Sequence, residues 1–334
     1  MRDTLVFRMA SVAAVLALCV VVLGAWVRLS NAGLGCPDWP GCYGRAGAPT
    51  GTREIQQANQ AFPQRPVQPS KAWKEMTHRY VAGTLGLLIG AMAVVAWRRR
   101  RGGTPVVLPT VLAGLVVFQA LLGMWTVTLL LKPLIVLAHL LGGLTILALL
   151  VWLALSHAPR LPELPHPRWL RGFALVGLAV LACQITLGGW TSTNYAALAC
   201  PDFPTCQGQW WPDTDFSGAF VPWHGPGINY EGGILDSPAR TAIHMTHRIG
   251  ALVTALVLGA LALSCLWPGR GRRLKTAGGV LLALLAAQLA LGVGNVLLLL
   301  PLPVATAHNA GAALLLVALV TLIRLLTRST PHAQ

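Results

Sequence analysis

Eight apolar segments divide this chain, and each is about as long as a helix needs to be to cross a bilayer. Their apolar residues run continuously rather than at every second position, which excludes the strands of an outer-membrane barrel. The chain is therefore predicted to be an all-α integral membrane protein with eight transmembrane helices. The segments cover approximately residues 5–27, 80–97, 106–131, 133–156, 170–190, 249–267, 276–300 and 304–326.

The positive charge of the chain indicates its orientation in the membrane. A formal net charge of +15 could suggest a nucleic-acid partner. The basic residues, however, cluster at 98–101 and 270–275, on the side that is cytoplasmic if the N-terminus is cytoplasmic, as the positive-inside rule requires. We therefore expect no nucleic-acid partner. We expect a multi-pass protein of the bacterial cytoplasmic (inner) membrane with both termini in the cytoplasm.

Histidines and glutamines recur at a fixed spacing of 169 residues. An even number of helices in each repeat makes both halves enter the membrane from the same side. The repeat predicts two pseudo-symmetric parallel four-helix bundles, formed by residues 1–160 and 165–334 and joined by a proline-rich linker at 160–168. The matched pairs are His78 with His247, Gln119 with Gln288, and His139 with His308.

The four repeated histidines are the leading candidates for a functional site. Each is expected at the start of an even-numbered helix, toward the outer face. Because an ionisable side chain within a membrane is energetically costly, its presence indicates a function. Two facing imidazoles in apolar surroundings suit six-coordinate haem iron. Zinc or copper would need more ligands or thiolates close by. A plain hydrogen-bonding role is the alternative, and the matched pairs weigh against it.

The halves differ three residues before their first histidine. Glu75 precedes His78, which puts both on one helix face, and the matched residue before His247 is His244. A carboxylate beside iron can exchange protons, although a glutamate near a helix start is also favoured by the helix dipole. The difference predicts chemistry in the first half and a permanent cofactor in the second. His244 could compete with His247 as a ligand, and its role stays open.

An arginine follows the first histidine of each half. Arg79 and Arg248 could pair with the carboxylates of haem propionates. The alternative is an interfacial arginine that extends to water. The sequence alone favours neither role.

Two long outer loops, at about 28–72 and 191–238, each contain the pattern Cys-Pro-Asp-x-Pro-x-Cys at a spacing of 164 residues. Outward loops lie in an oxidising compartment, which predicts two disulfides. A redox-active cysteine pair is the alternative. The other three cysteines are expected to be packing residues, and 54–62 could form a short helix. The predicted disulfides are Cys36–Cys42 and Cys200–Cys206, and the packing residues are Cys19, Cys183 and Cys265.

Taken together, these residues resemble the haem A synthase family over nearly the whole chain. The resemblance rests on the eight-helix layout, the paired cysteine loops and the histidine motifs. It implies oxidation of the C8 methyl group of haem O to a formyl group, giving haem A, with water expected to supply the oxygen. The motif residues are Glu75-Met-Thr-His78-Arg79, His139, His247-Arg248 and His308.

The resemblance also implies a role for each motif residue. His247 and His308 would be the axial ligands of a bound haem b. His78 and His139 would flank the iron of the substrate haem O, and Glu75 would be the essential carboxylate. Haem O synthase (protohaem farnesyltransferase) is an expected partner. An electron acceptor, of which a quinone is one candidate, is needed, and a homo-oligomer is left open.

Two other functions compete with this interpretation. A di-haem b electron-transfer protein would use the same histidines without needing Glu75, and it would place its haems on opposite sides of the membrane. A transporter built on a parallel repeat would carry charges at mid-depth in its helices, and this chain has almost none there.

Overall fold

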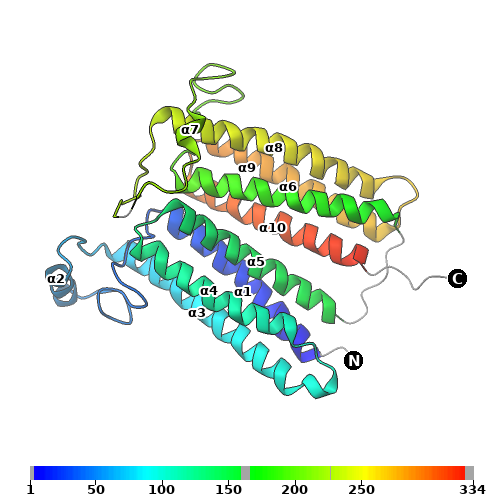
Figure 1. Cartoon of the computed structure of the whole chain (residues 1–334), viewed down its shortest axis with the longest axis horizontal. Helices are drawn as coiled ribbons and strands as arrows, with labels where there is room; N and C mark the ends of the chain where they lie inside the picture. Colours follow the sequence, from blue (N-terminus) through cyan, green and yellow to red (C-terminus); the bar gives the residue numbers. More distant parts are fainter. Residues whose placement is uncertain (1–3, 159–165, 226, 328–334) are drawn as a thin grey trace.

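The computed structural model describes residues 4–158, 166–225 and 227–327, and every regular element in these residues is a helix (Figure 1). Eight of these helices are long and apolar enough to cross a membrane, as predicted. They are α1 (Thr4–Leu29), α3 (Pro69–Arg98), α4 (Val107–Thr128), α5 (Pro133–His157), α6 (Arg168–Thr193), α8 (Ser237–Leu266), α9 (Arg272–Leu297) and α10 (Leu302–Thr327).

Helices α3 and α8 begin well before the apolar segments that they contain. Prolines in the first turn start both helices, and the Asp236 carboxylate caps α8 by accepting the N–H of Ala239 at 3.0 Å. His78 and His247 therefore lie about three turns inside their helices. The prediction that these histidines sit at helix starts was wrong, because the outer turns are polar and hydropathy alone does not detect them.

Helices α4 and α9 end about one turn earlier than their apolar segments suggest. The leucines that follow each helix adopt the left-handed backbone conformation, which stops the helix although the side chains remain apolar. The same turn thus occurs at the same place in both halves. The residues are Leu130 (φ 50°) and Leu131 (φ 61°), matched by Leu299 (φ 58°) and Leu300 (φ 60°).

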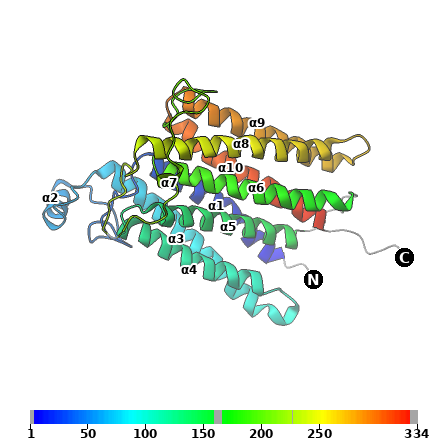
Figure 2. The same ribbon diagram turned by 45° about the horizontal axis from the view of Figure 1, so that its top comes forward.

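The membrane helices form two groups that lie side by side (Figures 1 and 2). In the first group α1 and α4 each pack against α3 and α5, and in the second α6 and α9 each pack against α8 and α10. Within the described residues α3 does not pack against α5, nor α8 against α10. The helices that carry the paired histidines therefore occupy opposite corners of their groups.

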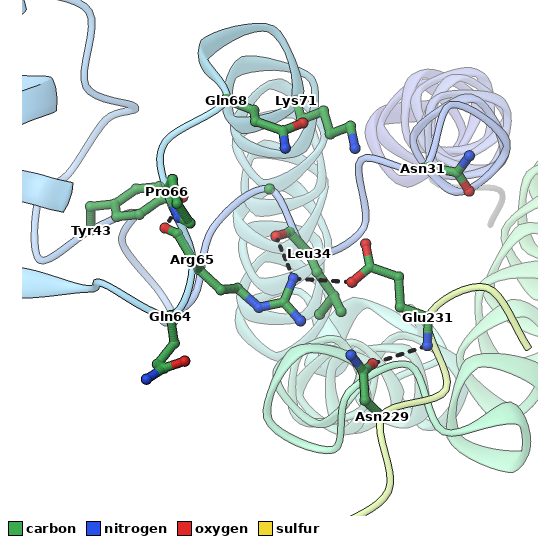
Figure 3. A pocket seen from close by; sticks show the side chains of 11 residues that line it. Asn31, Leu34, Tyr43, Gln64, Arg65, Pro66, Gln68, Lys71, Asn229 and Glu231 are labelled. Atoms are coloured by element: carbon green, nitrogen blue, oxygen red, sulfur yellow. Dashed lines mark hydrogen bonds and ion pairs between the residues drawn. The ribbon is translucent and has the colours of Figure 1, made fainter. Parts of the chain in front are cut away.

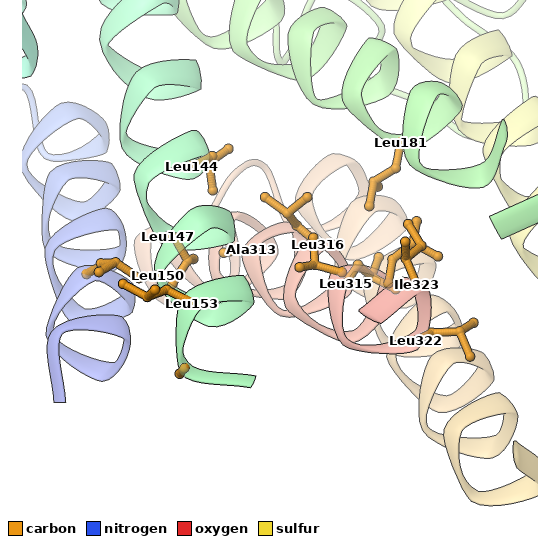
Figure 4. Packing of buried hydrophobic residues seen from close by; sticks show 14 of the residues in the cluster. Leu144, Leu147, Leu150, Leu153, Leu181, Ala313, Leu315, Leu316, Leu322 and Ile323 are labelled. Carbon is orange, nitrogen blue, oxygen red and sulfur yellow. The ribbon is translucent and has the colours of Figure 1, made fainter. Parts of the chain in front are cut away.

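Helices α5 and α10 form the seam between the two groups. Helix α10 packs against α1 and α5, and α5 also packs against α6. Apolar side chains of α5 and α10 gather along this seam (Figure 4), where packing stabilises membrane helices through van der Waals contact. Near one end Arg324 Nε donates to Ser156 Oγ at 3.1 Å. The predicted boundaries at residues 160 and 165 lie outside the described residues.

Each long loop carries a short helix. The first holds α2 (Thr52–Ala61), close to the predicted 54–62, and the second holds α7 (Phe216–Ala219). A single 3₁₀ turn, η1 (Arg100–Gly102), follows α3. Helix α7 packs against α8, whereas α2 stands away from the membrane helices in the described residues (Figure 1).

Candidate functional site

The four repeated histidines form two pairs, one in each group of helices. His78 of α3 and His139 of α5 are close enough to interact electrostatically, and so are His247 of α8 and His308 of α10. All four lie in the parts of their helices nearest the long loops. Each half thus brings together the two histidines that the repeat predicted, from helices at opposite corners.

Each histidine ring packs against a glycine of a neighbouring helix. A Cβ atom at Gly24 would lie 3.0 Å from Cε1 of His78, and one at Gly188 would lie 3.0 Å from Cε1 of His247. The glycines therefore leave room for the imidazoles. Sequence reasoning missed this contact, although Gly24 and Gly188 are separated by the same 164 residues as the cysteine loops. The corresponding pairs on the other helices are Gly123 with His139 and Gly292 with His308.

Three of the four imidazoles have a ring nitrogen without a hydrogen-bond partner. These are the buried Nδ1 atoms of His78, His139 and His308. The repeated glutamines contact two of the histidines. Gln119 Nε2 donates to the backbone carbonyl of His139 at 2.6 Å, and Gln288 Nε2 lies 3.4 Å from the ring atom Nε2 of His308. Unpartnered imidazole nitrogens in an apolar interior fit the axial ligation of haem.

Gln184 of α6 is a polar neighbour that the repeat did not reveal. Its Nε2 lies 3.1 Å from both the carbonyl oxygen and Nδ1 of His247. The residue at the matched position of α1 is Val20, so His78 lacks such an amide. The ring of His247 is therefore held by a contact that its counterpart does not have.

Glu75 lies one turn from His78 and joins α3 to the first cysteine loop. Its side chain is 6% exposed. One carboxylate oxygen accepts the N–H of Cys36 at 2.9 Å, and the other pairs with Nη2 of Arg79 at 2.5 Å. The carboxylate is thus fixed on two sides.

His244 makes the same connection in the second half. Its Nδ1 accepts the N–H of Cys200 at 3.2 Å, and its Nε2 lies 3.3 Å from Nε of Arg248. A neutral imidazole has one lone pair, so it cannot accept both bonds as the carboxylate of Glu75 does. Both halves therefore have a side chain that connects the helix to its cysteine loop. The two side chains differ in their charge and in their ability to bind a proton.

Arg79 and Arg248 bind the carbonyl groups of the cysteine loops. Each guanidinium donates to three backbone oxygens, which is a role that the sequence did not suggest. The acceptors are Asp38 (3.0 Å), Pro40 (3.2 Å) and Gly41 for Arg79, and Thr205 (2.8 Å), Cys200 (3.1 Å) and Asp202 (2.7 Å) for Arg248.

The structure contains both predicted disulfides. Cys36 is bonded to Cys42 and Cys200 to Cys206. Both loops also share a cis peptide bond before their second proline and matching left-handed residues after their second cysteine. Among the remaining cysteines Cys265 is buried, but Cys19 and Cys183 are exposed, so the packing role predicted for those two was wrong.

A cavity of about 270 Å³ lies outside the histidine pairs, between the first loop, the start of α3 and the second loop (Figure 3). Arg65 reaches into it and pairs with Glu231 of the second loop at 3.3 Å. Lys71 of α3 lines it, and Arg240, the matched residue of α8, lines a cavity of about 280 Å³ in the other half. None of the four histidines lines either cavity.

Comparison with known proteins establishes the family. A family model described as cytochrome oxidase assembly protein matches residues 7–320. The chain belongs to this family.

It is 45% identical to the haem A synthase of Shewanella oneidensis, over 96% of this chain and 94% of that protein. It is 29% identical to the haem A synthase of Caulobacter vibrioides, over 91% of each chain. The mouse haem A synthase COX15 is 27% identical, over 89% of this chain and 76% of that protein. The resemblance predicted from the motifs is thereby confirmed.

Proposed function

We propose that this member of the cytochrome oxidase assembly family is a haem A synthase. It oxidises the C8 methyl group of haem O to a formyl group, and water supplies the oxygen. One observation carries the proposal: similarity to a haem A synthase extends over 96% of this chain and 94% of that relative. The bacterial relatives and eight membrane helices support a place in the bacterial inner membrane. The termini are cytoplasmic and the haem sites lie toward the outer face.

In this proposal the two halves are pseudo-symmetric four-helix bundles with different tasks. Residues 165–334 hold haem b between His247 and His308, a role supported by the glycine contacts of both rings and by Gln184. When bound, haem b supplies a redox centre that can accept electrons from the substrate. The chain keeps that centre in an apolar interior, where water has little access.

Residues 1–160 bind haem O between His78 and His139, and Glu75 is the catalytic carboxylate. Glu75 accepts protons released from the oxidised methyl carbon or stabilises positive charge that develops there. The N–H of Cys36 and the Arg79 guanidinium keep its carboxylate in a defined orientation. We assign loop anchoring, not propionate binding, to Arg79 and Arg248, because loop carbonyls occupy both guanidinium groups.

The oxidation needs an electron acceptor and a source of substrate. A membrane quinone is the acceptor class we propose, and haem O synthase is the proposed donor of haem O. A di-haem b electron carrier is not favoured. Curated relatives are named haem A synthases, and all four histidines lie near the same ends of their helices.

Substitution of Glu75 by histidine tests the catalytic role directly, because it copies the residue of the second half. Glu75→His can retain the bond from Cys36 N–H while it removes the carboxylate. We expect haem A formation from haem O to fall by at least about 100-fold, the scale of a lost general base. Haem b content and the thermal unfolding midpoint should stay close to wild type. Pigment extraction with chromatography and reduced-minus-oxidised spectra measure these quantities.

Two further variants separate chemistry from loop anchoring. Glu75→Ala should also destabilise the protein by about 1–3 kcal/mol, because it leaves the Cys36 N–H and Arg79 without their buried acceptor. His244→Glu, the reciprocal change, should leave haem A formation intact. Wild-type rates of haem A formation in Glu75→His would refute the assignment.

A further inference from the structure

The two halves differ one turn outward from their first histidine. Lys74 precedes His78 by four residues, and the matched residue before His247 is Ile243. Residues four apart lie on the same helix face, about 6 Å apart along the axis. The difference therefore lies directly on the outer side of each histidine, where a bound porphyrin would present its edge.

In the second half this position is closed by apolar packing. Ile243 is 1% exposed and packs in one cluster with Trp190 and with Ala219 of α7. The indole N–H of Trp190 donates to the carbonyl of Ala219 at 2.9 Å. Helix α7 thus packs over Ile243 at the start of α8.

In the first half the same position carries a cation. Lys74 Nζ lies 4.9 Å from the ring centre of Trp26, which is the counterpart of Trp190. Both side chains are partly exposed. Helix α2, the short helix of this loop, stands away from the membrane helices in the described residues, so it does not cover Lys74 as α7 covers Ile243. At this position the first half is therefore more exposed than the second and carries a positive charge.

A porphyrin held between His78 and His139 has a strong orientational preference. Its two propionate groups are carboxylates, which are costly in the membrane interior, so they point toward the polar outer end. Lys74 is the first basic side chain outward from His78 on the same face of α3. Its ammonium group can donate charge-assisted hydrogen bonds to a carboxylate.

We propose that Lys74 binds a propionate carboxylate of the substrate haem; this inference rests on the substrate site proposed for the first half. Lys74 is a binding residue and takes no part in the oxidation. Both haem O and haem A carry propionates, so it holds substrate and product alike. Lys74 is partly exposed, which permits exchange of substrate and product, whereas the matched Ile243 is buried.

Esterified substrate provides the test. The full-length protein, purified in detergent with haem b bound, is titrated with haem O and with haem O dimethyl ester, and absorbance reports binding. We expect wild type to bind haem O about tenfold more tightly than the ester, the scale of one charge-assisted hydrogen bond. Lys74→Gln and Lys74→Ile should lose about that factor for haem O and none for the ester. Lys74→Arg should retain tight binding.

Lys275→Gln is the matched control, since it removes a lysine at the start of α9, near the opposite ends of the helices. Equal affinities of wild type and Lys74→Gln for haem O would overturn the inference. An equal loss of affinity for haem O and its ester would also overturn it, because a merely structural lysine behaves that way. Lys74-dependent binding without haem A production would instead refute the proposed function alone.

Discussion

At the scale of single residues, glycines decide where the histidine rings can lie. Gly24 and Gly188 each leave room for an imidazole on the adjacent helix, and any larger residue would contact the ring. Glycine is unfavourable inside a helix relative to alanine by roughly 1 kcal/mol. The close approach of two helix segments beside a ring is the physical reason for its presence here.

Gly188→Leu should therefore displace His247. Overpacking of this kind costs about 1–3 kcal/mol, and we expect haem b content to fall about tenfold. Gly172→Leu on the same helix is the control, because a Cβ at Gly172 meets no atom within 4 Å. Reduced-minus-oxidised spectra of purified protein, normalised to protein content, measure the outcome. Full haem b occupancy in Gly188→Leu would contradict the proposed ligation by His247.

At the scale of elements, disulfides close the cysteine loops and hydrogen bonds connect them to α3 and α8. Each loop is closed by a disulfide, held inward by an arginine of the helix, and held internally by an aspartate. In the first loop Asp38 accepts the N–H groups of Tyr43 and Gly44 at 2.6 and 2.7 Å. These contacts fix the residue that bridges loop and helix, Glu75 or His244, beside the first histidine.

The second loop should lose stability in acid. Hydrogen bonds hold the pKa of Asp202 below its ordinary value. The Thr205 hydroxyl contributes most, and the N–H groups of Gly208 and Gln207 contribute less. The stabilisation is therefore fully present above the ordinary pKa of an aspartate and is lost as pH falls through the lowered value. The amide resonance of Gly208, followed by NMR against pH, should shift in the pH range around the lowered pKa of Asp202. Asp202→Asn should abolish this pH-dependent shift. If the shift persists in Asp202→Asn, another group is responsible for it.

At the scale of the whole molecule, the two halves are joined through both membrane helices and loops. The α5–α10 seam is apolar, and the second loop also reaches over the first half, where the N–H of Tyr230 donates to Leu130 at 3.1 Å. On the same side Arg28 of α1 donates to the carbonyl of Ser192 at 2.8 Å. We therefore expect the halves to unfold together.

Leu319→Ala tests this coupling. Leu319 of α10 is fully buried, and its loss should destabilise the protein by about 2–4 kcal/mol through lost packing contacts. Loss of secondary structure and loss of haem b should then shift together to lower temperature in one transition. Leu314→Ala on the same helix is the control, since Leu314 is 37% exposed. Two separate transitions would show that the halves unfold independently.

The sequence predicted the membrane class, the eight helices, the pairing of the four histidines within the two halves, and both disulfides. It could do so because apolar length and repeated spacing are properties of the chain itself. It misplaced the starts of α3 and α8, whose polar outer turns are helical through caps and tertiary contacts. It also missed Gln184, because that residue has no counterpart in the repeat.

The sequence by itself thus determined how many helices cross the membrane and which residue types recur in the two halves. Only the tertiary structure decided that the histidine helices occupy opposite corners, that Arg79 and Arg248 hold loop carbonyls, and that Glu75 and His244 form equivalent bridges. Lys74 and Ile243 differ in sequence, but only their packing shows that Lys74 is partly exposed beside Trp26 and that Ile243 is buried beside α7. The physical reason is that the length of an apolar segment is a local property of the chain. The partners of a side chain depend instead on which distant segments pack beside it.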